Sequence, residues 1–280
     1  MIRTHHLAAL VLAATACTAL PATAAESFDS CDGRFIDSLP AHISTPGVWC
    51  LRHDVSTAIG AGAAINIAAN NVTLDCNGFR IGGLAAGTGS LASGIYASGR
   101  QNTTVRNCGI RGFYYGVLVE GGAGHLVEDN RMDNNLLNAI RVNADNSRVR
   151  RNAAFDTGGA TGRTDASAIV GTADITDNTV SGVFAEVAPS YPAGITATAA
   201  GQQVSRNVIR GLTPGAGGAA YGIIANSAGI TIDGNRVSAS GPVNGMGIVG
   251  VGNVFCINNT VAYFSAPIVS CRASTTNDSF

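Results

Sequence analysis

One six-residue pattern recurs along most of the chain: an apolar residue, two variable residues, asparagine, one variable residue and a second apolar residue. Its clearest copy is Val127-Glu128-Asp129-Asn130-Arg131-Met132. Consecutive asparagine positions are 22 to 31 residues apart, a period typical of a solenoid of stacked repeats. These positions are Asn77, Cys108 (in place of asparagine), Asn130, Asn152, Asn178, Asn207, Asn235 and Asn259.

A second pattern shows where each repeat forms a strand. From an inward apolar residue to the next asparagine position there are 9 to 13 residues. From that asparagine position to the next inward apolar residue there are 9 to 18 residues. Segments such as Val72-Thr73-Leu74-Asp75 alternate apolar and polar residues, which indicates β-strands. A small residue precedes each inward apolar residue, at Ala64-Ile65, Gly94-Ile95, Gly116-Val117, Ala139-Ile140, Ala168-Ile169, Gly194-Ile195, Gly222-Ile223, Gly247-Ile248 and Pro267-Ile268.

This pattern, over residues 60–271, resembles the right-handed parallel β-helix family that includes pectate lyases. The resemblance implies an all-β fold: a single right-handed parallel β-helix, built as a three-sheet solenoid of about eight to nine coils. We expect asparagine at each tight bend because it tolerates a left-handed backbone, and stacked asparagines can form a ladder. Residues 61–280 are assigned to this repeat domain. Residues 26–60 are assigned to an N-terminal cap segment, in which Trp49 covers the end of the core.

The first 25 residues have the features of a secretory signal peptide. Arg3 precedes an apolar run over residues 7–20, and small residues follow up to Ala24 and Ala25, near which we place the cleavage site. A lipoprotein signal at Cys17 is the alternative, although the usual leucine three residues before the cysteine is missing. No later apolar run is long enough to span a membrane. We therefore expect a secreted or periplasmic protein.

The charge balance argues against nucleic acid as a partner. The chain has 17 Lys plus Arg, all of them arginine, and 18 Asp plus Glu, for a formal net charge of −1. A nearly neutral chain has no global field to attract nucleic acid or an anionic membrane. The run of residues 129–135 is rich in Asp and Asn but lacks the spacing of a calcium-binding loop. We predict no metal site and no cofactor, and we expect a monomer.

Six of the seven cysteines remain after removal of the signal peptide. An even number of cysteines in an oxidising compartment favours disulfides. The alternative for Cys76 and Cys108 is that both are small buried core residues. The spacing suggests the pairs Cys31 with Cys50 in the entry segment, Cys76 with Cys108 on adjacent coils, and Cys256 with Cys271 in the last coil.

Charges beside the asparagine positions alternate in sign from one coil to the next. The residue before each asparagine is Asp129, Arg151, Asp177 and Arg206 in four consecutive coils, and one position earlier the order is Arg106, Glu128 and Arg150. On stacked strands these side chains lie above one another, so opposite charges attract. We interpret them as a structural ladder of ion pairs. An arginine-rich face that binds a polymer is the alternative.

Two coils with short connections form the floor of a predicted dip between long insertions. The floor lies around Val117 and Ile140, and alternation directs Glu120 and Arg141 outward as candidate catalytic residues. The candidate substrate-binding residues are Tyr96, Tyr114, Tyr115, Asn138, Asn143, Arg163 and Asp165. The insertions are residues 82–93, 157–167, 182–193, 211–221 and 238–246.

Aromatic faces surrounded by polar groups suit a carbohydrate, so we predict a polysaccharide as the partner. If the protein is an enzyme, it is a polysaccharide lyase or a glycoside hydrolase. A lyase needs a base and a group that neutralises the uronate, and a hydrolase needs two carboxylates, of which only Glu120 is well placed. The catalytic motifs of polygalacturonases and pectate lyases are absent. One alternative is a Glu120–Arg141 ion pair on a solvated sheet. The other is a non-catalytic scaffold or adhesion-type binding module.

Overall fold

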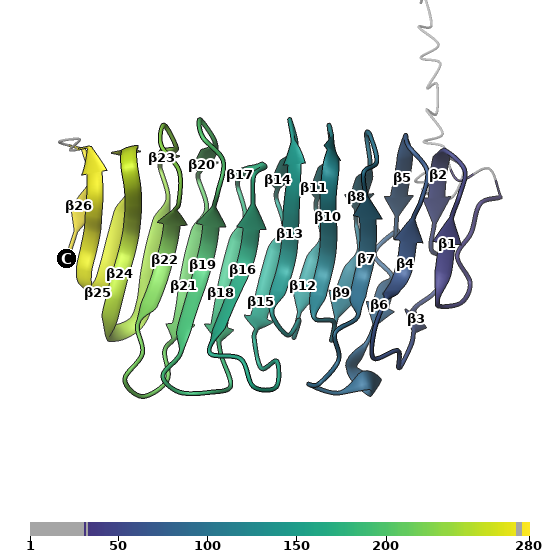
Figure 1. Ribbon diagram of the computed structural model, residues 1–280, viewed down its shortest axis with the longest axis horizontal. Coiled ribbons are helices and arrows are strands. Elements are labelled where there is room, and N and C mark those ends of the chain that lie inside the picture. The colour runs from purple at the N-terminus through teal and green to yellow at the C-terminus, as the bar shows by residue number, and fades with distance from the viewer. Residues whose placement is uncertain (1–30, 32, 273–275) are drawn as a thin grey trace, which may run out of the picture.

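The computed structural model describes residues 31, 33–272 and 276–280, which form a single right-handed parallel β-helix of about nine turns. Figure 1 shows the strands side by side along one long axis, from β1 at the N-terminal end to β25 and β26 at the C-terminal end. A short 3-10 helix, η2 (Leu84–Ala86), is the only helical element in the described part of the chain. No helix among these residues is long and apolar enough to cross a membrane. The predicted all-β solenoid is confirmed.

Almost every turn contributes one strand to each of three parallel sheets, which we call sheets A, B and C. Sheet A contains β1 (Ala41–Ile43), β4 (Ala63–Ile67), β7 (Ser93–Ser98), β10 (Tyr115–Ala123), β13 (Asn138–Asp145), β16 (Asp165–Gly171), β19 (Tyr191–Ala197) and β22 (Ala220–Ala225). Sheet B contains β2 (Gly47–Cys50), β5 (Val72–Asp75), β8 (Thr104–Arg106), β11 (Leu126–Glu128), β14 (Arg148–Arg150), β17 (Asp174–Thr176), β20 (Gln203–Ser205) and β23 (Thr231–Asp233). Sheet C contains β3 (Val55–Ser56), β6 (Arg80–Gly82), β9 (Gly109–Arg111), β12 (Arg131–Asp133), β15 (Ala153–Thr157), β18 (Thr179–Phe184) and β21 (Val208–Thr213). The long strands β24 (Arg236–Ile257) and β25 (Thr260–Arg272) pass through all three sheets, and β26 (Asp278–Ser279) pairs with β25 in sheet C.

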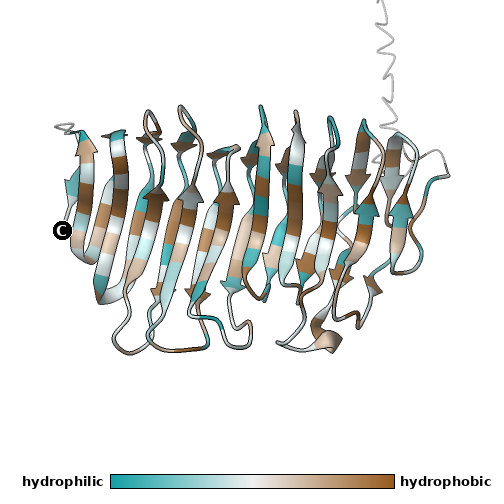
Figure 2. Cartoon of the chain, viewed as in Figure 1, coloured by the Kyte–Doolittle hydropathy of each residue, from teal (hydrophilic) through white to brown (hydrophobic). Residues whose placement is uncertain are grey.

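The core is a column of apolar side chains inside the solenoid. Figure 2 shows the hydrophobic residues as bands that cross neighbouring strands at similar heights. A single coil buries too little apolar surface to be stable, so stacking the coils is what forms the core. The inward residues of sheet A, aligned strand by strand, are Ile65, Ile95, Val117, Ile140, Ile169, Ile195, Ile223, Ile248 and Ile268.

The small residue before each inward apolar residue is explained by close approach of neighbouring coils. A Cβ atom added at Gly116 would lie 2.5 Å from the carbonyl oxygen of Ala139 in the next coil. A Cβ at Gly222 would lie 2.2 Å from the carbonyl oxygen of Gly247. At such distances the backbone has to shift, so at these two positions the local packing favours glycine.

The asparagine ladder is present from Asn130 to Asn277. In each coil the backbone N–H and the side-chain Nδ2 of one asparagine donate to Oδ1 of the next, at 2.9–3.1 Å. The sequence pattern missed Asn277, which continues the ladder beyond Asn259. At the other end, the N–H of Cys108 donates to Asn130 Oδ1 at 3.0 Å.

Two details of the predicted ladder are wrong. From Cys108 to Asn259, the left-handed residue of each bend is the one before the asparagine position, and its φ lies between 53° and 65° at Asn107, Asp129, Arg151, Asp177, Arg206, Gly234 and Asn258. That residue turns the chain, so the asparagine side chain is free to point inward. Among the described asparagine positions, only at Asn77 is the asparagine itself left-handed, with a φ of 51°. Asn77 is outside the ladder and donates to Leu51 O instead, because four residues separate β5 from β6 where two separate β8 from β9.

The three predicted disulfides are present. Cys31 pairs with Cys50, Cys76 with Cys108, and Cys256 with Cys271, with Cα–Cα distances of 5.8, 4.7 and 5.7 Å. The Cys76–Cys108 bridge joins two adjacent coils directly before the first ladder asparagine. The alternative of two free core cysteines is therefore wrong, because adjacent coils bring their sulfur atoms together.

Coil stacking begins earlier in the chain than the predicted boundary at residue 61. Strands β1, β2 and β3 pair in parallel register with β4, β5 and β6, so residues 41–56 already form the first coil. Trp49 aligns with Leu74 of the next coil and packs against the core. A capping role for the segment before residue 41 stays a prediction. The predicted signal peptide lies outside the described residues.

The alternating charges form ion pairs on the outer side of sheet B and its bends, as predicted. Arg151 Nη2 lies 2.8 Å from Asp129 Oδ2, and Arg206 Nε lies 2.7 Å from Asp177 Oδ1. The hydrogen bond from Arg151 lowers the pKa of Asp129 below its usual value. Because these side chains are about 40–60 % exposed, water screens each pair and its contribution to stability is small.

Candidate functional site

The outer face of sheet A carries one row of aligned side chains across its first five strands. Strand register places His42, Asn66, Tyr96, Leu118 and Arg141 beside one another on β1, β4, β7, β10 and β13. Each follows directly after an apolar or small residue that faces the core, so alternation along the strand turns it outward. The row therefore runs parallel to the axis of the solenoid.

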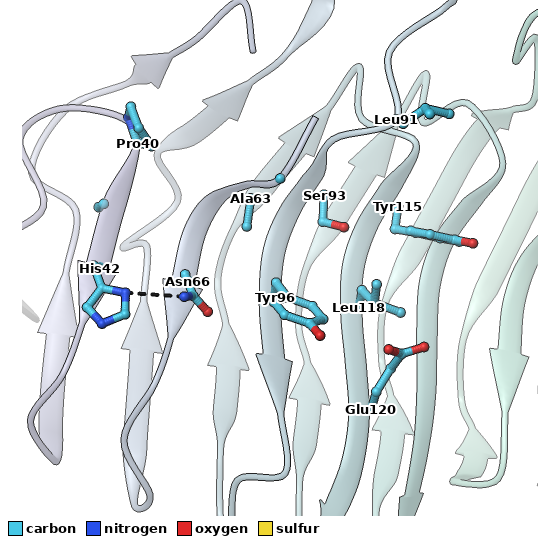
Figure 3. Close-up of a pocket in the computed structure, with 12 residues that line it drawn as sticks. Pro40, His42, Ala63, Asn66, Leu91, Ser93, Tyr96, Tyr115, Leu118 and Glu120 are labelled. Carbon is cyan, nitrogen blue, oxygen red and sulfur yellow. Dashed lines mark hydrogen bonds between the residues drawn. The ribbon is translucent and has the colours of Figure 1, made fainter. Parts of the chain in front are cut away.

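A groove with a volume of about 650 Å³ lies over β1, β4, β7 and β10. Of the predicted residues, Tyr96, Tyr115 and Glu120 line it. His42 and Asn66 line the N-terminal part, where Asn66 Nδ2 lies 3.2 Å from His42 Nδ1 (Figure 3). The groove thus lies toward the N-terminus from the predicted floor at Val117 and Ile140.

His42, Asn66 and Ser93 line the groove but were not among the predicted site residues. The predicted cap segment, residues 26–60, includes His42, so the predicted sheet begins after it. The sequence held a usable signal, because His42 precedes Ile43 by one residue just as Asn66 precedes Ile67. Aligning the repeat one coil further toward the N-terminus would have placed both side chains in the outward row.

Arg141 turns toward Tyr115 and away from Glu120. Its Nη1 donates to the Tyr115 hydroxyl at 3.4 Å, and its guanidinium carbon lies 5.7 Å from the centre of the Tyr115 ring. Register explains the separation, since Leu118 is opposite Arg141 while Glu120 is opposite Asn143. No ion pair joins Glu120 to Arg141 in the described part of the chain. The alternative of a Glu120–Arg141 salt bridge is therefore wrong.

A second group of predicted residues lies near Arg141, on the side of the loops. The rings of Tyr114 and Tyr115 meet edge to face with centres 4.8 Å apart. Arg163 Nη2 lies 2.7 Å from Asp165 Oδ1, and this pairing raises the pKa of Arg163 above its usual value. Partial burial raises the pKa of Tyr114, and the charge of Arg163 opposes that shift. Tyr115 thus connects the groove to this second group.

Asn138 and Asn143 have different surroundings although both lie on β13. Asn138 is buried, and its Nδ2 donates to Ser167 O at 2.7 Å and to Leu137 O at 2.9 Å. Asn143 is half-buried and aligned with Glu120 at the outward position. The Asn138 amide is thus occupied in holding β13 against β16, whereas the Asn143 side chain faces outward beside Glu120.

The loops on either side of the predicted dip meet each other. Thr161 N donates to Thr88 O at 3.0 Å, and the two threonine hydroxyl oxygens are also 3.0 Å apart. These residues belong to the insertions 82–93 and 157–167, which leave the same edge of the solenoid (Figure 1). The two coils with short connections are therefore bridged along this edge.

The chemistry of the groove is that of a binding surface with one carboxylate. Among the described residues that line it, Glu120 is the only Asp or Glu. A glycosidase uses two carboxyl groups about 5 to 10 Å apart. Among the described residues, no group of three or more His, Cys, Asp and Glu is placed to hold a metal ion. The lining residues provide aromatic faces, an imidazole, one amide and one carboxylate.

His125, which lies close after Glu120 in the sequence, is buried and structural. Its Nδ1 accepts from Thr103 N at 3.2 Å, and its Nε2 lies 3.3 Å from Gly121 O. This arrangement fits the neutral ring that carries its proton on Nε2. Burial lowers the pKa of His125 below its usual value of 6.5, although the contact with Gly121 O opposes the shift.

We expect stability to fall as the pH drops below that value. The unfolded chain binds a proton on His125 more readily than the folded chain does. The neutral ring therefore contributes fully to the free energy of unfolding above the pKa of the unfolded chain, and this contribution is lost as the pH falls through the pKa of the folded chain. Thermal unfolding midpoints between about pH 7.5 and pH 5.5 measure the loss. His125→Gln keeps a donor and an acceptor but does not titrate, so its midpoint should change less. If the unfolding midpoint changes equally with pH in both proteins, His125 is not the source of the loss.

Comparison with known proteins places the fold in a family. Residues 53–209 match the family described as right handed beta helix region. No curated protein matches the sequence. Similar solved structures include a double mutant of the periplasmic alginate epimerase AlgG, with 14% identity and a TM-score of 0.40 over 81% of this chain and 61% of that one. The Dettilon tailspike protein has 16% identity and a TM-score of 0.47 over 87% and 59%.

The DFA-IIIase of Arthrobacter chlorophenolicus A6, in complex with DFA-III, has 9% identity and a TM-score of 0.40 over 82% of this chain and 63% of that one. This chain spans about three fifths of the length of these three structures. At such identities the similarity concerns the fold, and the chemistry has to be argued from the residues themselves.

Proposed function

This chain belongs to the right-handed β-helix family, and we propose that it binds a polysaccharide in the groove over β1, β4, β7 and β10. The observation that carries the proposal is the combination of Tyr96 and Tyr115 with His42, Asn66 and Glu120 in one open groove of about 650 Å³. Ligand sites are concave and mostly apolar, with a few polar groups that fix orientation. A sugar ring has apolar faces and a rim of hydroxyl groups, which this set of side chains complements.

The direction of the outward row supports a chain-like ligand. Neighbouring strands of a sheet lie about 4.8 Å apart, so the four steps from His42 to Arg141 span about 19 Å along the axis. Side chains of one row therefore meet successive parts of an extended polymer. A compact ligand would contact only one or two of these strands.

A polysaccharide lyase is the second candidate, and the contact between Arg141 and Tyr115 favours it. In a β-elimination, a base takes the proton from the carbon next to a uronate carboxylate. A carbon–carbon double bond forms as the bond to the leaving sugar oxygen breaks, and that oxygen receives the proton from the protonated base. Tyr115 in its deprotonated form would be the base, and Arg141 would pair with the carboxylate. A hydrolase has less support, because in the described part of the chain Glu120 is the only carboxylate that lines the groove.

The binding proposal predicts a loss of affinity when Tyr96 is replaced by alanine. Removing the ring takes away one aromatic face, and we expect binding to weaken about tenfold, which corresponds to about 1.4 kcal/mol. Calorimetric titration with a panel of neutral and acidic oligosaccharides measures the change. Tyr221→Ala is the matched control, because Tyr221 also belongs to sheet A but lies on β22, away from the groove. Equal affinities of the two variants would contradict the placement of the site.

Turnover assays on the same panel separate a lyase from a binding module. Absorbance of unsaturated chain ends detects elimination, and release of reducing ends detects hydrolysis. Elimination that disappears in Arg141→Ala would support the lyase, whereas binding without turnover would support a non-catalytic module. If no oligosaccharide binds or reacts, the groove is not a carbohydrate site.

We also propose that the protein is exported and works outside the cytoplasm. Three disulfides in the described residues fit an oxidising compartment. The predicted signal peptide, with cleavage near Ala24 and Ala25, supports the same location. Mass determination of the N-terminus of the protein recovered from the periplasm or medium tests the cleavage site and the lipoprotein alternative at Cys17.

A further inference from the structure

The groove contains a carboxylate that the described part of the chain leaves without a charge partner. Glu120 is half-buried and lines the groove, and among the described residues no arginine or histidine nitrogen lies within 4.0 Å of its side-chain oxygens. Its side chain also makes no hydrogen bond with other described residues, although its backbone oxygen accepts from Gly99 N. Figure 3 shows the carboxylate projecting from β10 beside Leu118. The negative charge therefore remains available to a ligand.

Two arginines on the neighbouring coils, Arg141 and Arg100, make hydrogen bonds with groups other than Glu120. Arg141 donates to the Tyr115 hydroxyl at 3.4 Å. Arg100 follows Ser98, the strand partner of Glu120, and its guanidinium donates to Ser98 O and Ala68 O, both at 2.8 Å. These hydrogen bonds hold the two guanidinium groups against backbone or phenol oxygens. Neither group neutralises the carboxylate by direct pairing.

Two tyrosine rings line the same groove as this carboxylate. Tyr96 is aligned with Leu118, the residue two positions before Glu120, and Tyr115 lies further back on the same strand as Glu120. Ring faces of tyrosine attract cations, and a carboxylate attracts them more strongly. A carboxylate in a groove that is also lined by tyrosine rings is a suitable environment for an ammonium group.

We propose that the groove selects polysaccharides that carry free amino groups, with Glu120 as the residue that pairs with the ammonium. This inference rests on the proposed carbohydrate binding and names the class of sugar. A polymer of uronates would bring negative charge toward Glu120 and would be disfavoured by repulsion. The inference therefore opposes the lyase candidate, in which a uronate binds beside Tyr115.

The test compares oligomers of glucosamine and N-acetylglucosamine of the same length at physiological ionic strength and slightly acidic pH. These ligands share a backbone and differ in the charge on the amine. We expect the glucosamine oligomer to bind about fivefold more tightly, as one partly exposed ion pair allows. Glu120→Gln should remove this difference, because the glucosamine oligomer then loses the carboxylate that pairs with its ammonium group. Glu186→Gln is the matched control, because Glu186 is an exposed glutamate outside the groove.

The outcomes distinguish this inference from the proposed function. Equal binding of the two oligomers by the unmodified protein would overturn the preference for amines and leave carbohydrate binding intact. A preference that survives in Glu120→Gln, or that disappears in Glu186→Gln as well, would overturn the role of Glu120. If neither these oligomers nor any other oligosaccharide binds, the proposed function and this inference both fail.

Discussion

Loss of the Cys76–Cys108 disulfide is expected to lower the free energy of unfolding by about 3–4 kcal/mol. The two cysteines are 32 residues apart in sequence, the longest separation of the three bridges. A cross-link that closes a longer loop restricts the unfolded chain more. Urea unfolding of a Cys76→Ala/Cys108→Ala variant measures the loss. The matched variant Cys256→Ala/Cys271→Ala, with a separation of 15 residues, should lose less.

The position of this bridge at the end of the ladder predicts that Cys108→Asn can extend the ladder and restore part of the lost stability. The Cys108 backbone N–H already donates to Asn130 Oδ1, as each ladder asparagine does to the next. An asparagine side chain there would also reach Asn130 Oδ1 and the carbonyl of Leu74, which is aligned with Val105, the acceptor for Asn130. Cys76→Ala/Cys108→Asn should therefore regain about 1 kcal/mol over the double alanine variant. Equal stability of the two variants would show that an asparagine side chain does not extend the ladder at position 108.

Replacement of Asn152 by alanine is expected to cost about 1–3 kcal/mol. Asn152 is buried in the middle of the ladder, where its Oδ1 accepts from Asn130 N and Asn130 Nδ2. Its Nδ2 donates to Val127 O at 2.9 Å and to Asn178 Oδ1 at 3.0 Å. Alanine leaves these groups without partners in a site that water reaches poorly. A thermal or urea unfolding midpoint reports the loss.

The control for Asn152 is the same substitution on the outside of the same coil. Asn143 is half-buried on β13 and faces outward, and no hydrogen bond of its side chain to other described residues is present. Asn143→Ala should therefore change the unfolding midpoint little. An Asn152→Ala variant as stable as Asn143→Ala would show that the ladder does not contribute to stability.

The inward row and the ladder could be predicted because both follow directly from the period of the chain. Every coil repeats one apolar residue such as Val117 or Ile140, and burial requires that these residues stack. The Cys76–Cys108 bridge could be predicted for the same reason, since a spacing of about one repeat places residues on adjacent coils. Periodicity fixes which residues are neighbours across strands, and it needs no knowledge of side-chain direction.

The candidate site could be predicted only in part, because side-chain direction depends on the neighbours that tertiary structure supplies. Sequence alternation placed Glu120 and Arg141 on the outer face, but it could not show that Arg141 turns to Tyr115 and leaves the carboxylate unpaired. Likewise, the repeat pattern could place His42 in the outward row, but only the packed structure shows that this row borders a groove.

The sequence by itself determined the solenoid, its core and its cross-links, because these depend on residue type and spacing, which repeat in every coil. Only the tertiary structure decided the position of the groove and the meeting of the Thr88 and Thr161 loops. These features arise where the repeat is interrupted, by insertions and by a first coil without the asparagine signature. At such places packing between distant segments sets the geometry, and the spacing of the repeat does not determine it.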